Sequence, residues 1–209
     1  MSFKVLLLNG SPKEKGCTAR ALEEIIKVLN DEGIETELIQ VGGKDIRGCI
    51  ACGGCSKTGR CVFDDIVNDV ADKFKQADGL IVGTPVYYAG ANGTLISLMD
   101  RLFYSSNFDK TMKVGACITS SRRAGNTSAS EEIHKYFGIS HMPIASSNYW
   151  NEVHGFKAED VEKDLEGLQT MRNLARNVAF LIKAIKLGKD EYGLPKNERG
   201  AFTSFPDGL

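Results

Sequence analysis

Five short apolar runs, separated by longer segments with helical periodicity, constrain the fold of this chain more than any other feature. The runs at 3–8, 79–84 and 114–119 are almost continuously apolar, as in strands buried on both faces, whereas 36–41 alternates and predicts an edge strand. A weaker fifth run covers 142–146. Strands that alternate with helices form a parallel sheet with helices on both faces. The sequence therefore predicts an α/β fold with a doubly wound five-stranded parallel sheet.

The segments that connect the predicted strands have the periodicity of helices. They lie at about 18–31, 66–76, 93–104, 128–137 and 158–187. Crossovers of this kind fit the strand order 2-1-3-4-5. In that order a ligand binds outside the carboxyl ends of the strands, where the order reverses. We therefore expect the functional loops to follow the first, third and fourth strands.

The domain organisation follows from length and from the polar C-terminus. A chain of 209 residues needs only one hydrophobic core, so we expect one domain over 1–187. Residues 188–209 form a polar tail that carries Tyr192, Phe202 and Phe205. A tail with three aromatic residues lies either across its own domain or against a neighbouring subunit.

Charge and hydropathy narrow the classes of partner. The chain has 26 basic and 27 acidic residues, so no overall basic field exists to bind nucleic acid or an anionic membrane. No apolar stretch approaches the ~20 residues that span a bilayer, and residues 1–4 run directly into the first strand instead of forming a signal peptide. We expect no nucleic-acid or membrane partner and a cytoplasmic location.

The loop after the first strand has the composition of a phosphate-binding turn. Residues 9–18 are rich in Gly and hydroxyl side chains and lead directly into a helix, whose N-terminal N–H groups suit a phosphate. Ser11 and Thr18 add hydroxyl donors. The loop is neither a G-x-G-x-x-G nor a Walker motif, so a monophosphate such as that of FMN fits better. The alternative is an ordinary turn in which Thr18 caps the helix.

Four of the six cysteines crowd into thirteen residues of an insertion at 45–63. Their spacing is C-x2-C-x2-C-x5-C, and the four are Cys49, Cys52, Cys55 and Cys61. Three cysteines at successive x2 intervals are typical of ferredoxin-like runs, while structural zinc sites more often pair two C-x2-C knuckles across a longer spacer. The spacing favours a [4Fe-4S] cluster over zinc. Because the insertion leaves the carboxyl end of the second strand, which borders the first strand, we expect it to lie at the same edge of the sheet as the phosphate loop.

These motifs resemble those of a known family. Residues 8–13 with Gly16 and Thr18 resemble the opening motif of the NADPH-dependent FMN reductase group of flavodoxin-like proteins. Those proteins usually have Asn where this chain has Cys17, which removes one side-chain phosphate donor. The cysteine spacing and the ending 61–65 resemble the compact motif of the iron-sulfur flavoproteins, a branch of that group.

Two further loops match the same group. In the family, the loop that corresponds to 83–90 lies along the flavin ring, and the one that corresponds to 119–127 lies beside it. Arg122 and Arg123 would then supply positive charge near the flavin or near NADPH. The alternatives are an ordinary surface turn and two solvated arginines. The segment 148–155, which holds Trp150, approaches the flavin in the resembling family, often across a subunit interface; otherwise it is a packed aromatic loop.

The resemblance implies specific residues. The implied FMN contacts are Ser11, Lys13, Cys17, Thr18, Ala19, Pro85, Val86, Tyr87, Tyr88, Thr119, Ser120 and Arg122, and the implied cluster ligands are the four cysteines of the insertion. No catalytic acid or base is required, because a flavin performs its own chemistry.

The implied function is an FMN-dependent oxidoreductase, with NAD(P)H or reduced ferredoxin as electron donor and a quinone, an oxygen species or another small oxidant as acceptor. A homodimer or homotetramer is also implied. One alternative is a flavodoxin-type carrier without small-molecule turnover. Another is a regulatory module in which zinc orders the cysteine loop and no flavin binds. Proteins that resemble this branch can also keep the cysteines as thiols or a disulfide without a cluster.

Overall fold

The central strands of the computed structural model are buried on both faces, as the apolar runs predict. β1 (Phe3–Asn9), β3 (Gly79–Pro85) and β4 (Val114–Ser121) form the centre of the sheet, while β2 (Ile34–Gln40) and β5 (Glu152–His154) form its edges. All neighbours pair in parallel, in the order β2-β1-β3-β4-β5. The structure describes residues 3–198 and 200–201. The predicted fold class and strand order are confirmed.

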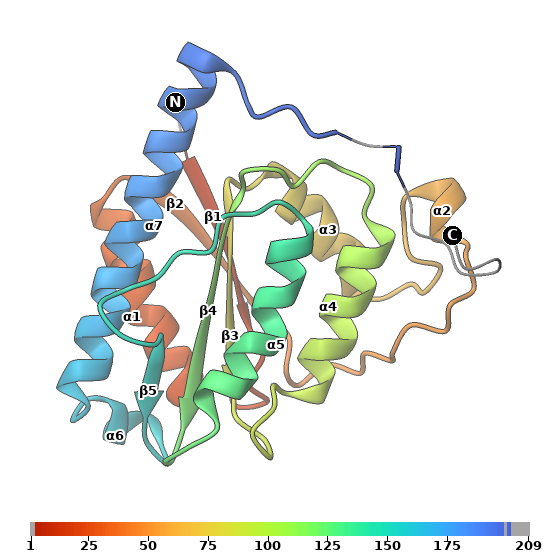
Figure 1. Ribbon diagram of the computed structural model, residues 1–209. Helices are drawn as coiled ribbons and strands as arrows, with labels where there is room; N and C mark the ends of the chain where they lie inside the picture. The colour runs from red at the N-terminus through yellow and green to blue at the C-terminus, as the bar shows by residue number, and fades with distance from the viewer. Residues whose placement is uncertain (1–2, 199, 202–209) are drawn as a thin grey trace.

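Helices cover both faces of the sheet (Figure 1). One layer contains α1 (Cys17–Asp31), α6 (Ala158–Val161) and α7 (Leu165–Tyr192); the other contains α3 (Ile66–Gln76), α4 (Gly93–Ser105) and α5 (Asn126–Ile139). Successive side chains of a strand point to opposite faces. Val5 and Leu7 of β1 accordingly belong to the core under α1 and α7, whereas Leu6 and Leu8 belong to the core under α3 and α4.

The fifth strand differs from the sequence prediction. The run at 142–146 makes only an isolated bridge to β4, between Gly115 and Ile144, and the paired strand is β5. Pro143 has no N–H to donate, so this segment cannot extend a regular ladder. Met142 and Ala145 are buried, which means that the apolar pattern reports core packing and not strand pairing.

The predicted C-terminal helix is two helices that meet at Asp164. The Asp164 carboxylate accepts hydrogen bonds from the N–H of Gly167, which caps α7, and from the N–H of His154 in β5. α7 then runs to Tyr192 instead of ending at residue 187. Phe202 and Phe205 of the predicted tail lie outside the described residues.

The cysteine insertion leaves the sheet after β2 and contains one short helix, α2 (Cys55–Thr58). Figure 1 shows α2 on the far side of α4, near the end of α4 that lies away from the carboxyl ends of the strands. The Asn107 side chain, just beyond α4, lies against Gly59 at the end of α2. The insertion is therefore packed on the second half of α4.

Among residues 3–198 and 200–201, no helix has the length and apolar character needed to cross a bilayer.

Gly115 offers a test of the packing between β4 and α5. A Cβ atom at this position would lie 2.6 Å from the fully buried Phe137 ring, so overpacking should lower the free energy of unfolding of Gly115→Ala by about 1–3 kcal/mol. Gly138→Ala is the matched control, because no atom lies within 4 Å of the added Cβ and alanine favours a helix. Urea denaturation measures both; equal stabilities of the two variants would contradict the packing described.

Candidate functional site

Loops at the carboxyl edge of the sheet meet around one cavity of about 360 Å³. They follow β1, β3, β4 and β5, which are the strands on either side of the point where the strand order reverses. The lining includes nine of the twelve predicted FMN contacts: Ser11, Lys13, Cys17, Thr18, Pro85, Val86, Tyr87, Ser120 and Arg122. The structure thus brings most of the predicted residues together.

Three predicted contacts do not line this cavity. Ala19 is buried in the core beneath α1, and Thr119 is buried within β4. Tyr88 is fully exposed at the tip of a turn, so its side chain points away from the cavity. Ala19 lies within α1 and Thr119 within β4, next to residues that do line the cavity, and the predicted contacts of all three residues with FMN remain predictions.

The first loop is held rigidly by its neighbours. The Lys13 N–H donates to Ser11 Oγ, and the Ser11 N–H donates to the Asn9 side chain. Gln40 Nε2 donates to the Ser11 carbonyl at 2.6 Å, which ties the loop to the end of β2. A Cβ at Gly42 would lie 2.2 Å from the Gly10 carbonyl oxygen, so only glycine permits this approach of the two loops.

The N-terminus of α1 opens onto the cavity without a side-chain cap. Gly16 precedes the helix, no acidic residue lies in its first turn, and Thr18 instead shares a 2.8 Å hydrogen bond with Ser120 at the end of β4. The first N–H groups of a helix have no intrahelical partner and attract anions. Burial raises the pKa of the Cys17 thiol, so this residue stays protonated near neutral pH.

The loop after β3 forms a two-residue hairpin turn. The N–H and carbonyl groups of Tyr87 and Gly90 exchange hydrogen bonds, and Tyr88 and Ala89 between them both adopt positive φ. Left-handed backbone at two non-glycine residues costs energy and is maintained only by the surrounding structure. Glu132 of α5 supplies part of that support by accepting a hydrogen bond from the Ala91 N–H.

Sequence reasoning missed the last side of the cavity. Residues 155–159 follow β5 and bring Phe156 and Lys157 into the lining, and Lys15 joins them from the first loop. The sequence prediction placed the fifth strand about ten residues too early, so it did not identify residues 156–159 as the loop that follows this strand. Tyr149 and Trp150 are exposed and contact each other edge to face, with ring centroids 4.7 Å apart.

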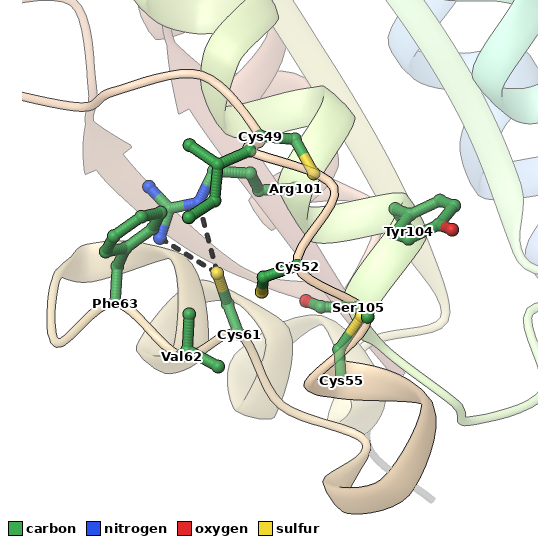
Figure 2. A pocket seen from close by; sticks show the side chains of 11 residues that line it. Cys49, Cys52, Cys55, Cys61, Val62, Phe63, Arg101, Tyr104 and Ser105 are labelled. Carbon is green, nitrogen blue, oxygen red and sulfur yellow. Dashed lines mark hydrogen bonds between the residues drawn. The ribbon is translucent and has the colours of Figure 1, made fainter.

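The four cysteines of the insertion surround a second, much smaller pocket of about 20 Å³ (Figure 2). Cys49 and Cys52 are exposed, while Cys55 and Cys61 are half-buried; none of the four forms a disulfide. Within residues 3–198 and 200–201, no three His, Cys, Asp or Glu side chains are grouped closely enough to hold a metal ion. The described loop therefore gathers the thiols without a ready-made site for a single ion.

Cys61 is the most firmly held of these cysteines. Asn68 of α3 accepts a hydrogen bond from the Cys61 N–H and donates one to its carbonyl. Figure 2 shows the Arg101 guanidinium of α4 against the Cys61 sulfur, with Nε and Nη2 each 3.2 Å from it. Arg101 also forms a bidentate ion pair with Asp65. Nothing in the cysteine spacing pointed to Arg101.

The two pockets share no residue, and α4 lines the cysteine pocket but not the larger cavity. α4 begins just after the hairpin turn of the larger cavity, and Arg101 and Tyr104 in its second half line the cysteine pocket. A helix rises about 1.5 Å per residue, so Arg101 lies about 12 Å along the axis from Gly93. The insertion follows β2, and we expected it to lie at the carboxyl edge of the sheet beside the phosphate loop. The structure instead places its cysteines further along α4.

The sequence matches a known family. Residues 3–157 match the family described as NADPH-dependent FMN reductase. An iron-sulfur flavoprotein of Methanocaldococcus jannaschii is 36% identical over an alignment of 192 residues, which covers 88% of this chain and 100% of the relative.

The fold matches solved flavodoxin-like structures. A flavodoxin, WrbA-like protein of Agrobacterium tumefaciens has a TM-score of 0.61 at 16% identity, over 88% of this chain and 99% of that one. FerB of Paracoccus denitrificans, a flavoenzyme NAD(P)H:(acceptor) oxidoreductase, has a TM-score of 0.65 at 14% identity, over 87% and 98% of the two chains. At such identities the likeness shows the fold alone, which is flavodoxin-like as predicted.

The ion pair between Arg101 and Asp65 should dominate the stability of the cysteine insertion. Asp65→Ala leaves a buried guanidinium unpaired and removes the cap of α3, so we expect a loss of about 3–5 kcal/mol in the free energy of unfolding. Asp72→Ala is the matched control, because it breaks the exposed pair with Arg60, which is worth about 0–1 kcal/mol. Thermal denaturation of both variants provides the comparison, and a loss below about 1 kcal/mol in Asp65→Ala would contradict the expectation.

Proposed function

Because the chain belongs to the NADPH-dependent FMN reductase family, we propose that its cavity at the carboxyl edge binds FMN non-covalently, with the phosphate at the loop that precedes α1. As a member of that family the chain is a flavoprotein oxidoreductase. The observation that carries the proposal is the convergence of the loops after β1, β3 and β4 on one cavity beside an uncapped helix N-terminus.

The phosphate end of the cavity has the required donors. The free N–H groups at the start of α1, the Ser11 hydroxyl and the Lys13 ammonium all border it. A phosphate would supply the negative charge that the first turn of α1 lacks. The thiol of Cys17 contributes little here, but its backbone N–H is part of the same turn.

The other end of the cavity suits a flat ring with a polar edge. Pro85, Val86 and Tyr87 present apolar surface next to the fixed backbone of the hairpin turn. Ser121 borders the cavity, and its hydroxyl is buried without a hydrogen-bond partner in the described structure. A volume of about 360 Å³ lies within the range of small-molecule sites.

When bound, FMN supplies the electron-accepting and hydride-accepting chemistry. The part of the chain is to bind and orient the cofactor and to place positive charge around it. Lys13, Lys15, Arg122 and Lys157 all border the cavity, against a single acidic residue, Glu159. This excess of positive charge favours a cofactor that carries negative charge and attracts an anionic electron donor.

We further propose that Cys49, Cys52, Cys55 and Cys61 bind a [4Fe-4S] cluster. The donor set is entirely sulfur, as such clusters require, and the relative from Methanocaldococcus jannaschii carries the name iron-sulfur flavoprotein. Each cysteine of a four-iron cluster binds a different iron, so the thiols need not converge on one point as they must around zinc. The small pocket volume means that the exposed segment 49–53 must move outward to admit a cluster.

The electron donor in this proposal is NAD(P)H or reduced ferredoxin, and the acceptor is a quinone, an oxygen species or another small oxidant. Rapid oxidation of NAD(P)H by the purified protein would distinguish this oxidoreductase from a flavodoxin-type carrier. We also propose a cytoplasmic homodimer or homotetramer whose interface includes either the exposed pair of Tyr149 and Trp150 or the C-terminal tail.

Thr18→Glu tests the phosphate position. The added carboxylate and volume at the second residue of α1 should raise the Kd for FMN at least tenfold, or about 1.4 kcal/mol. Thr127→Glu is the matched control, because Thr127 is the second residue of α5 and is exposed outside the cavity. Since Thr18 is buried, the exposed Lys13→Glu serves as a second test with little risk to folding. Fluorescence titration gives the Kd values, and unchanged affinity in both cavity variants would refute the site.

Cys55→Ser tests the cluster. Protein made and reconstituted without oxygen should contain about four irons and four sulfides per chain, and the variant should contain less than half of that while it still binds FMN. The matched control is Cys117→Ala, because Cys117 is buried in β4 and does not line the cysteine pocket. An anaerobic wild type that holds only flavin, or zinc at the four thiols, would rule out the cluster.

A further inference from the structure

Arg101 is a fully charged side chain in the interior of the protein. It lies on α4 between Leu98 and Leu102, and its side chain is only 1% exposed. Arginine is rarely buried unless each of its donors is satisfied, because desolvation of the charge is costly. An arginine guanidinium is not deprotonated in proteins, so Arg101 is a permanent cation.

All five N–H donors of this guanidinium have an acceptor. Asp65 accepts one hydrogen bond from Nη1 at 2.6 Å and one from Nη2 at 2.9 Å, and the Arg47 carbonyl accepts a second from Nη1 at 3.2 Å. The remaining two, from Nε and Nη2, go to the sulfur of Cys61, each at 3.2 Å (Figure 2). Two of the five donors of the buried cation thus serve a single thiol.

The hydrogen bonds to the sulfur atoms differ strongly among the four cysteines. Cys61 receives two charge-assisted hydrogen bonds, whereas Cys49 accepts only one long bond from the N–H of Ala51. The Arg47 carbonyl already ties the guanidinium to the insertion, and Asp65 ties it to the start of α3, so fastening the loop does not require contact with the sulfur. Hydrogen bonds to ligand sulfurs and nearby positive charge are known to tune iron-sulfur reduction potentials.

We propose that Arg101 is a positioning residue that raises the reduction potential of the cluster by donating two hydrogen bonds to the Cys61 sulfur. Reduction adds one electron, and no bond is formed or broken. The added negative charge spreads onto the thiolate ligands, where a buried cation stabilises it strongly because the surroundings have a low dielectric constant. This inference rests on the proposed cluster.

The experiment is an anaerobic potentiometric titration, monitored by EPR, of the reconstituted wild type, Arg101→Gln, Arg101→Lys and Arg60→Gln. The Gln variant removes the positive charge and the planar fork of guanidinium N–H donors. The Lys variant keeps the charge but cannot present the same fork. Arg60→Gln is the matched control, because Arg60 precedes Cys61 directly and loses the same charge, yet its guanidinium is exposed and pairs with Asp72.

We expect Arg101→Gln to shift the equilibrium between reduced and oxidised cluster at least tenfold toward the oxidised form, a decrease of 59 mV in a one-electron midpoint potential. Arg101→Lys should shift it in the same direction by less, and Arg60→Gln by less than threefold. Iron, sulfide and FMN contents, measured on the same samples, show whether each variant is loaded.

Two results would overturn the inference and leave the cluster standing. One is a loaded Arg101→Gln variant within threefold of the wild type, and the other is a shift of equal size in Arg60→Gln. If Arg101→Gln takes up no cluster, the test depends on Arg101→Lys. A midpoint potential of Arg101→Lys equal to that of the wild type would contradict the role of the two hydrogen bonds from the guanidinium to Cys61. A wild type without iron would instead remove the proposed cluster itself, and this inference with it.

Discussion

A parallel sheet whose central strands are buried on both faces is the constraint on which the rest of the structure depends. β1, β3 and β4 can be buried in this way only if each connection crosses over as a helix, and the crossovers leave all the loops that follow the strands at one edge. The reversal of strand order between β1 and β3 then opens a cavity at that edge. The flavin site that we propose is a consequence of how the core is covered.

The cysteine insertion is held by a different set of contacts, which includes a buried cation. The segment between β2 and α3 contains only the short helix α2. Arg101 of α4 reaches Arg47, Cys61 and Asp65 at once, and Asn68 of α3 also binds Cys61. Arg101 stands on α4, the helix that follows the hairpin turn after β3, and Tyr87 of that turn lines the larger cavity.

The sequence predicted the structure best where an apolar pattern has a single cause, such as burial of a strand on both faces. The apolar runs of β1, β3 and β4 reflect two-sided burial, and the strand order followed from them. The prediction of a strand at 142–146 was wrong. Met142 and Ala145 are apolar because they pack in the core, while Pro143 prevents a regular ladder of hydrogen bonds with β4. The cysteine spacing predicted a shared pocket, but Arg101 is visible only as a charge on the buried face of α4, beside Leu98 and Ser105. Its partners in the insertion depend on the tertiary structure.

We propose that one chain carries a flavin site at the carboxyl edge of the sheet and an iron-sulfur site beside the second half of α4. The decisive experiment is an anaerobic crystal structure of the reconstituted protein, with anomalous diffraction at the iron edge. We expect iron at the four cysteines of the insertion, with Arg101 still against Cys61, and FMN in the larger cavity with its phosphate at the N-terminus of α1. Iron absent from the insertion, or a flavin phosphate bound away from residues 11–18, would contradict the account.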